Sequence, residues 1–234
     1  MDTPYRLHYA PDNASLIVRL ALEELGQPYA TVLVDRATRE QDSAAYRALN
    51  PAGLIPVLET PDGAVFETGA ILLWLADRHG ALAPAPGDPA RGDMLKWLFF
   101  VSNTLHPALR ISFYPDRYIG SDAAAQARLR AHMQGEIARH LDTLESAAGD
   151  LPALFDGAVP TMIGLYLGPV LRWLALYPEA ETGWFDLNRW PRLHALAAAL
   201  ETRASTAAAI AAEGLGPAPF TAPQPPDPPE GSAT

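Results

Sequence analysis

One stretch of this sequence constrains the fold more than any other. Residues 50–58 read Asn-Pro-Ala-Gly-Leu-Ile-Pro-Val-Leu, and a Pro-Asp-Gly turn, a second short apolar run and an apolar helix starting near Glu67 follow. Pro56 has no backbone donor, so it is expected to begin an extended segment or to lie at a sheet edge. A cis peptide bond is also affordable before a proline at such a corner. The pattern predicts a β-turn-β-helix unit.

This unit would leave backbone groups open to a ligand. The groups just before Pro56 could pair with an extended peptide, and Glu67 and Thr68 lie at a helix start, where N–H groups favour an anion. An ordinary connection between a helix and a strand would contain the same residue types. The stretch alone therefore leaves both interpretations open.

The overall charge limits the partners of the chain. Its net charge is −10, and no basic cluster occurs along the sequence, which argues against binding of nucleic acid or of an anionic membrane surface. No apolar run approaches the length of a membrane span, and the first residues do not form a signal peptide. We expect a cytosolic protein.

The 234 residues include no cysteine. This excludes disulfides, thiolate metal sites and a cysteine nucleophile, so any thiol chemistry must use a thiol that a substrate brings. His132, Glu136 and His140 lie on one predicted helix face. A single helix with two such histidines cannot complete the coordination shell of a metal, and we expect no metal site.

The first 80 residues alternate between strand and helix patterns. Short β-rich runs at 5–9 and 29–34 flank a helix that follows Ser15 and stops at Gly26, and a less periodic helix covers about 40–49. With the unit described above, the predicted order is β-α-β-α-β-β-α. We assign residues 1–80 to one domain and the proline-rich residues 81–89 to a linker.

The remainder of the chain carries helical patterns. Amphipathic or apolar segments predict an all-helical domain over residues 90–213; the helices are expected near 95–114, 122–148, 161–176 and 191–212. From residue 214 to 234 proline and small polar residues dominate. Such a segment has little to bury, so we expect a disordered tail.

The element order and the opening motif together resemble the glutathione S-transferase superfamily over about residues 5–212. The most specific match is Asn50-Pro51-x-Gly53-x-Ile55-Pro56-Val57-Leu58 followed by Glu67-Thr68 before an apolar helix. The resemblance implies a thioredoxin-like βαβαββα domain followed by a C-terminal helical bundle. It also implies a homodimer and glutathione as co-substrate.

The same resemblance implies a set of glutathione-binding residues. Pro56 would be the cis-proline, and the backbone of Ile55 would pair with the cysteinyl part of glutathione. Glu67 and Thr68 would hold the γ-glutamyl end, and Arg39 would approach the glycyl carboxylate.

The closest pattern is that of the bacterial beta class. Tyr9-x-Pro11-x-x-Ala14-Ser15-Leu16 is similar to its Tyr-x-Pro-x-x-Cys-Ser-Leu, and His106 matches a histidine beside the glutathione sulfur. The class's catalytic cysteine is replaced by Ala14, which rules out its mixed-disulfide chemistry. The lysine after its histidine is Pro107 here.

The family's capping box in the helical domain also departs from its pattern. Thr161-Met162-Ile163-Gly164 stands where Thr-x-x-Asp is expected. The missing carboxylate would cost the helix start roughly 0.5–2 kcal/mol.

If glutathione binds, the site must stabilise its thiolate, which is the nucleophile. Lowering a thiol pKa from ~8.5 by about two units requires roughly 2.7 kcal/mol of preferential stabilisation of the anion. Charge-assisted hydrogen bonds at a helix start could supply it. The candidate catalytic residues are Ser15, Asn13, Tyr9 and His106.

Each candidate also has a purely structural interpretation. Ser15 could be an ordinary N-cap, Asn13 a turn residue, Tyr9 a core tyrosine at a strand end and His106 a packed histidine. Aromatic residues of the helical part would form either core or an electrophile pocket.

Three functions therefore remain open at this stage. The first is a glutathione transferase that adds the thiolate to a hydrophobic electrophile or reduces a peroxide with it. The second is a glutathione-fold protein that binds a ligand or partner without turnover. The third is a glutathione-dependent lyase or isomerase.

Overall fold

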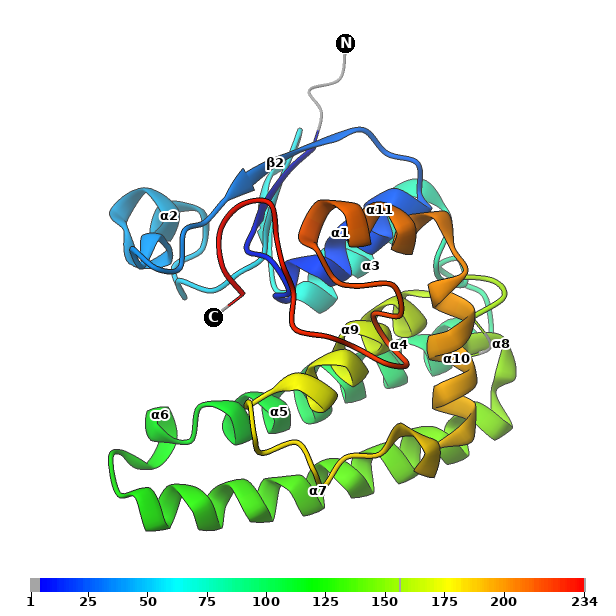
Figure 1. Cartoon of the computed structure of the whole chain (residues 1–234). Coiled ribbons are helices and arrows are strands. Elements are labelled where there is room, and N and C mark those ends of the chain that lie inside the picture. Colours follow the sequence, from blue (N-terminus) through cyan, green and yellow to red (C-terminus); the bar gives the residue numbers. More distant parts are fainter. Residues whose placement is uncertain (1–4, 156, 234) are drawn as a thin grey trace.

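A four-stranded mixed sheet lies at the centre of the N-terminal domain in the computed structural model, which describes residues 5–155 and 157–233 (Figure 1). The strand order is β2-β1-β3-β4, with β1 Tyr5–Tyr9, β2 Tyr29–Leu33, β3 Val57–Thr60 and β4 Gly63–Phe66. Strand β1 pairs parallel with β2 and antiparallel with β3, where Leu7 lies opposite Leu58. Strands β3 and β4 form an antiparallel hairpin.

The helices of this domain lie on both sides of the sheet. Helices α1 (Ser15–Glu24) and α3 (Thr68–His79) lie on one side and α2 (Ala44–Leu49), preceded by the short η1 (Glu40–Asp42), on the other (Figure 1). Helix α1 buries Leu16, Ile17 and Leu20 because these recur at helical spacing. The expected βαβαββα order is confirmed.

The second part of the chain is helical, as expected. Its central helix is α9, whose residues 162–174 are all buried. No helix within 5–155 and 157–233 is both long and apolar enough to cross a membrane. The elements are α4 (Arg91–Phe100), η2 (Val101–Leu105), α5 (His106–Phe113), α6 (Asp116–Ile119), α7 (Ala123–Asp150), α8 (Pro152–Phe155), α9 (Met162–Leu176), η3 (Leu187–Arg189), α10 (Pro191–Glu201) and α11 (Ala204–Glu213).

Two local features of these helices follow from single residues. Segment η2 is π-helical, and the His106 N–H bonds the Val101 carbonyl five residues back. Pro107 follows immediately; it has no N–H and its ring would crowd the carbonyl four residues earlier in an α-helix. At the start of α9, Thr161 keeps the capping bond to the Gly164 N–H at 3.1 Å, although the carboxylate of the capping box is absent.

The C-terminal segment differs from the expected disordered tail. The structure places residues 214–233 against both domains, with Leu215 and Phe220 buried. The reason is Arg172 in α9, which is fully buried and donates to the carbonyls of Leu215 and Gln224 at 3.0 and 2.9 Å. Two buried apolar side chains and the backbone carbonyls that Arg172 holds therefore anchor this segment together.

Arg172 also joins the helical part to the N-terminal domain. Its Nε lies 2.8 Å from Oδ1 of Asp12, and both side chains are fully buried. The other donors to Asp12 are the Trp173 Nε1 at 2.9 Å and the Tyr177 hydroxyl at 2.8 Å. A parallel link connects α11 to α1, where Glu213 accepts from Arg19 at 2.7 Å. The two parts of the chain therefore share a buried polar interface.

Replacing Arg172 by methionine should lower the free energy of unfolding by about 3–5 kcal/mol, because Asp12 would remain buried without its cation. Urea unfolding followed by circular dichroism would measure this. Lys96→Met is the matched control: Lys96 makes an exposed pair with Asp93, and its loss should cost less than about 1 kcal/mol. Equal effects of the two substitutions would contradict the role given to Arg172.

Candidate functional site

The loop before β3 presents an open backbone. The Ile55–Pro56 peptide bond is cis, as the resemblance implies. Helix α2 and its C-cap hold the loop, because the Tyr46 hydroxyl and the Asn50 amide both donate to the Leu54 carbonyl, at 2.9 and 2.7 Å. Within the described residues, neither backbone group of Ile55 makes a hydrogen bond. An extended ligand could pair there.

The start of α3 is open as well. No side chain caps it, and Glu67, at its N-cap, has a positive φ of 71° and an exposed side chain. Thr68 is buried next to it. Uncapped N–H groups at a helix start favour a negatively charged ligand group.

The turn between β1 and α1 carries Asn13 and Ser15. The Ser15 hydroxyl is fully buried; it donates to the Ala10 carbonyl at 3.0 Å and accepts from the Ala10 N–H at 3.3 Å. Asn13 accepts from the Ala14 N–H through Oδ1 at 2.8 Å. Its Nδ2 has no hydrogen-bond partner among residues 5–155 and 157–233. Of the two, Asn13 therefore has the free donor.

Tyr9 already has a partner. Its hydroxyl donates to the carboxylate of Glu230 in the C-terminal segment, and the Arg19 guanidinium lies 4.9 Å from its ring centroid. Burial and the Glu230 carboxylate raise the pKa of Tyr9 well above its usual range. The phenol is therefore protonated at neutral pH, and its proton is engaged.

His106 begins α5 and is partly buried against α9. Its Nδ1 is 2.8 Å from the Tyr166 hydroxyl, and its ring is tilted over Trp173 at 5.6 Å between centroids. Burial and the nearby Arg110 lower the pKa of His106 to about 4, so the imidazole is neutral at neutral pH. Burial raises the pKa of Tyr166, and a hydrogen bond with the side chain of Thr68 partly opposes this rise.

Arg39 lies apart from these residues. It is exposed at the start of η1 and pairs with Asp42 at 2.6 Å. The structure therefore connects Thr68, Tyr166 and His106 through side chains, whereas it leaves Arg39 in the α2 region.

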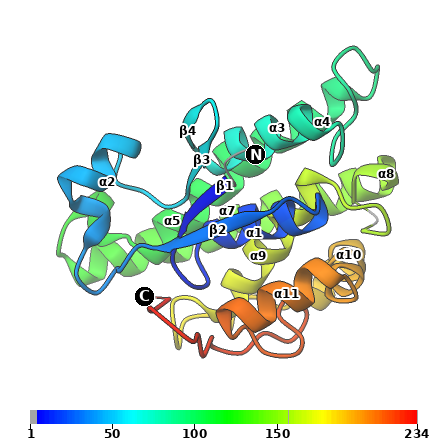
Figure 2. The ribbon, with the colours of Figure 1, turned by 90° about the horizontal axis from the view of Figure 1, so that it is seen from above.

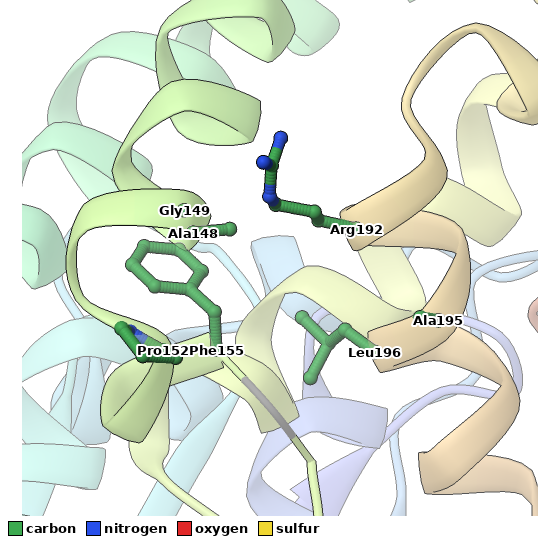
Figure 3. Close-up of a pocket in the computed structure, with 7 residues that line it drawn as sticks. All are labelled: Ala148, Gly149, Pro152, Phe155, Arg192, Ala195 and Leu196. Carbon is green, nitrogen blue, oxygen red and sulfur yellow. The ribbon is translucent and has the colours of Figure 1, made fainter.

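The larger of two described cavities does not coincide with this site. It measures about 340 Å³ and lies between the end of α7, α8 and the start of α10, where Phe155, Leu196 and Arg192 line it (Figure 3). Arg192 is already paired with Glu145 at 3.3 Å. No group of three or more His, Asp or Glu residues that could hold a metal occurs in the part of the chain that the structure describes.

Comparison with known proteins decides the family. Residues 14–78 match the family model "Glutathione S-transferase, N-terminal domain", and residues 123–199 match "Glutathione S-transferase, C-terminal domain". Glutathione S-transferase GST-4.5 of Xanthomonas campestris pv. campestris is 30% identical over 220 residues, which cover 90% of this chain and 99% of the relative. The chain belongs to the glutathione S-transferase family.

Other relatives of this glutathione S-transferase family member span more than one activity. A solved sphingomonad glutathione S-transferase complexed with glutathione is 30% identical, with a TM-score of 0.72. The match covers 90% of this chain and 100% of the sphingomonad chain. Maleylpyruvate isomerase of a Ralstonia species is 29% identical over 78% of this chain and 84% of the relative. The family includes both transferases and isomerases by name.

The sequence did not identify several residues that contact the candidates. Asp12 stands beside Asn13, but its buried partners lie more than 150 positions away. Tyr166 is one of the aromatic residues of the helical part, which the sequence left open as core or electrophile pocket. Glu230 lies in the segment expected to be disordered, so no signal in the sequence pointed to it.

The neutral state of His106 predicts a pH dependence. Its folded pKa is near 4, whereas an unfolded histidine titrates near 6.5, so the unfolded chain takes up the proton first as the pH falls. The stabilisation that comes from keeping His106 neutral is complete above pH ~6.5 and is lost as the pH falls from about 6.5 to 4. At pH 5 the loss amounts to about 2 kcal/mol.

We therefore expect His106→Gln to show a shallower loss of stability between pH 7 and pH 5 than the wild type. Urea unfolding at both pH values, at one protein concentration, would measure it. The control His132→Gln changes an exposed histidine and should keep the wild-type slope. If His106→Gln loses stability as steeply with falling pH as the wild type does, the His106 ring takes up its proton as readily in the folded state as in the unfolded state.

Proposed function

We propose that this protein binds glutathione and stabilises its thiolate by hydrogen bonding. The thiolate would then be transferred to a hydrophobic electrophile or would reduce a peroxide. The observation that carries the proposal is the open backbone of Ile55 before the cis Pro56. The relative whose structure is described as complexed with glutathione supports it.

Glutathione would lie across three elements of the N-terminal domain. The backbone of Ile55 would pair with the cysteinyl part, as an added strand pairs with a sheet edge. The open start of α3, with Glu67 and Thr68, would hold the γ-glutamyl end. Arg39 would approach the glycyl carboxylate by exchanging its exposed pair with Asp42, which costs little in water.

The thiolate would be held mainly by Asn13. Its Nδ2 has no partner in the described chain, and it lies at the turn that opens α1. Ser15 would support the turn, because donating to a thiolate would require it to give up its buried bond to Ala10. Tyr9 is engaged by Glu230. A neutral His106 would act through Tyr166 on Thr68 and would place no charge beside the sulfur.

Asn13→Ala should separate binding from thiolate stabilisation. Calorimetric titration should give micromolar-to-millimolar binding of reduced glutathione, and the variant should stay within about threefold because thiol binding does not need Asn13. The pKa of the bound thiol, followed by thiolate absorbance against pH, should rise by about one unit. The value of kcat/KM at pH 7 should fall about tenfold or more.

Tyr9→Phe is the matched control in this experiment. It removes a hydroxyl from the same turn region but should leave the pKa of the bound thiol unchanged. A shift in Tyr9→Phe and none in Asn13→Ala would reverse the assignment of the donor. Failure of the wild type to bind glutathione would refute the proposed function itself.

Two other functions would give different results in the same assays. Binding of glutathione without turnover of any electrophile or peroxide would indicate a binding protein, an alternative that the replacement of a catalytic cysteine by Ala14 supports. Glutathione-dependent isomerisation of a maleyl-type substrate would indicate an isomerase, as the name of the Ralstonia relative suggests.

We also propose that the protein is a homodimer. Phe66 of β4 and Phe99 of α4 are large apolar side chains that the single chain leaves 36% and 52% exposed, and exposed apolar patches commonly mark interfaces. Light scattering after size-exclusion chromatography should give twice the 25.2 kDa chain mass. Phe99→Glu should shift the protein toward the monomer; a wild type that elutes as a monomer would refute the proposal.

A further inference from the structure

The last described residues of the chain lie against the end of β1 and the turn that carries Asn13. We use "C-terminal strap" for residues 228–233, which follow the part of the segment that Arg172 anchors. Figures 1 and 2 show this red segment leaving the helical part and ending near the strands of the N-terminal domain. Residues 229–231 of the strap are exposed and its other residues are partly buried, so the strap lies at the surface.

The strap contacts the turn that carries Asn13. Glu230 accepts the hydroxyl of Tyr9, at the end of β1. A Cβ added to Gly231 would lie 3.3 Å from Cδ of Pro11 and 2.7 Å from Cδ1 of Leu33, so the strap leaves no gap there. Because Pro11 is two positions before Asn13, the strap borders the space beside the proposed thiolate donor.

The strap also contacts the segment that follows β2. The Arg36 guanidinium, after β2, donates to the carbonyl of Ala233. The same guanidinium lies 3.4 Å from the hydroxyl of Tyr114 at the end of α5. Arg36 therefore links the strap to the end of α5 in the second domain.

Some relatives align with this chain over their whole length while part of this chain remains outside the match. The sphingomonad structure is covered completely by 90% of this chain, and the matched C-terminal domain model ends at residue 199.

We propose that the C-terminal strap is the outer wall of the second-substrate side of the candidate site, with Gly231 and Glu230 as specificity-determining residues. The inference rests on the proposed function, because it takes the sulfur of glutathione to lie beside Asn13. A large group on that sulfur would meet the strap where it contacts Pro11 and Leu33. The wall therefore excludes large second substrates, because they would clash with the strap, and admits small ones.

Binding of S-substituted glutathiones tests the wall without requiring turnover. Removal of residues 228–234 keeps the carbonyls of Leu215, Pro219 and Gln224 that Arg172 holds, so the anchored segment remains. Calorimetry should show that the truncated protein binds S-hexylglutathione about tenfold more tightly than the full chain does. Its affinities for glutathione and S-methylglutathione should stay within about threefold.

Gly231→Ala offers the same test in the full-length chain. Gly231 has a positive φ of 71° that alanine resists, and the added methyl group would press on Cδ of Pro11 as well as on the end of the Leu33 side chain, so we expect the strap to be displaced. We expect the same selective gain for S-hexylglutathione. Gly26→Ala is the matched control: its φ is 60°, but nothing lies within 4 Å, so any loss of stability should come without a change in selectivity.

The outcomes separate the two proposals. If the full chain binds no glutathione, the proposed function fails and the wall fails with it. If glutathione binds but truncation and Gly231→Ala leave the ratio of S-hexyl to glutathione affinity unchanged, only the wall is refuted. Weaker S-hexyl binding in both variants would also refute it, because the strap would then attract the substituent.

Discussion

The buried ion pair between Asp12 and Arg172 is the contact on which the rest of this structure depends. Each partner alone would be a costly charge inside the protein, and the pair is tolerated because Trp173, Tyr177 and backbone carbonyls satisfy the remaining bonding positions. Asp12 fixes the turn that presents Asn13. Arg172 fixes the C-terminal segment. One interaction therefore sets the position of the proposed thiolate donor and of the strap that borders it.

The second connection between the domains carries no charge. His106 is neutral because burial and Arg110 lower its pKa, and it joins Tyr166, which in turn contacts Thr68 at the start of α3. A neutral relay can hold a hydroxyl in place without adding a cation near the sulfur. The stabilisation of a thiolate in this site must then come from neutral donors and from open backbone groups at helix starts.

Local sequence signals were sufficient for the fold and for part of the site. The helix start near Glu67 and Thr68 and the order of the elements depend on neighbouring residues and on short-range periodicity, so the sequence could predict them, and the family resemblance implied the cis bond before Pro56. The partners of Asp12 and Tyr9 could not be predicted, because they lie 160 and 221 positions away. The composition of residues 214–233 predicted disorder, whereas the buried Arg172 binds backbone carbonyls of this segment. Carbonyls occur in every residue, so composition gives no sign of such an anchor.

The same reasoning explains how a chain without cysteine can keep this site. In place of a cysteine at the turn there is Ala14, and the hydroxyl of Ser15 is used to bind Ala10. Within the described residues, that arrangement leaves the Nδ2 of Asn13 as an unused donor at the same turn. On the outer side, the strap engages Tyr9, which would otherwise be a second donor at the same end of β1. One contact with the strap would therefore have two consequences under the proposed function: the strap would border the sulfur position, and Asn13 rather than Tyr9 would stabilise the thiolate.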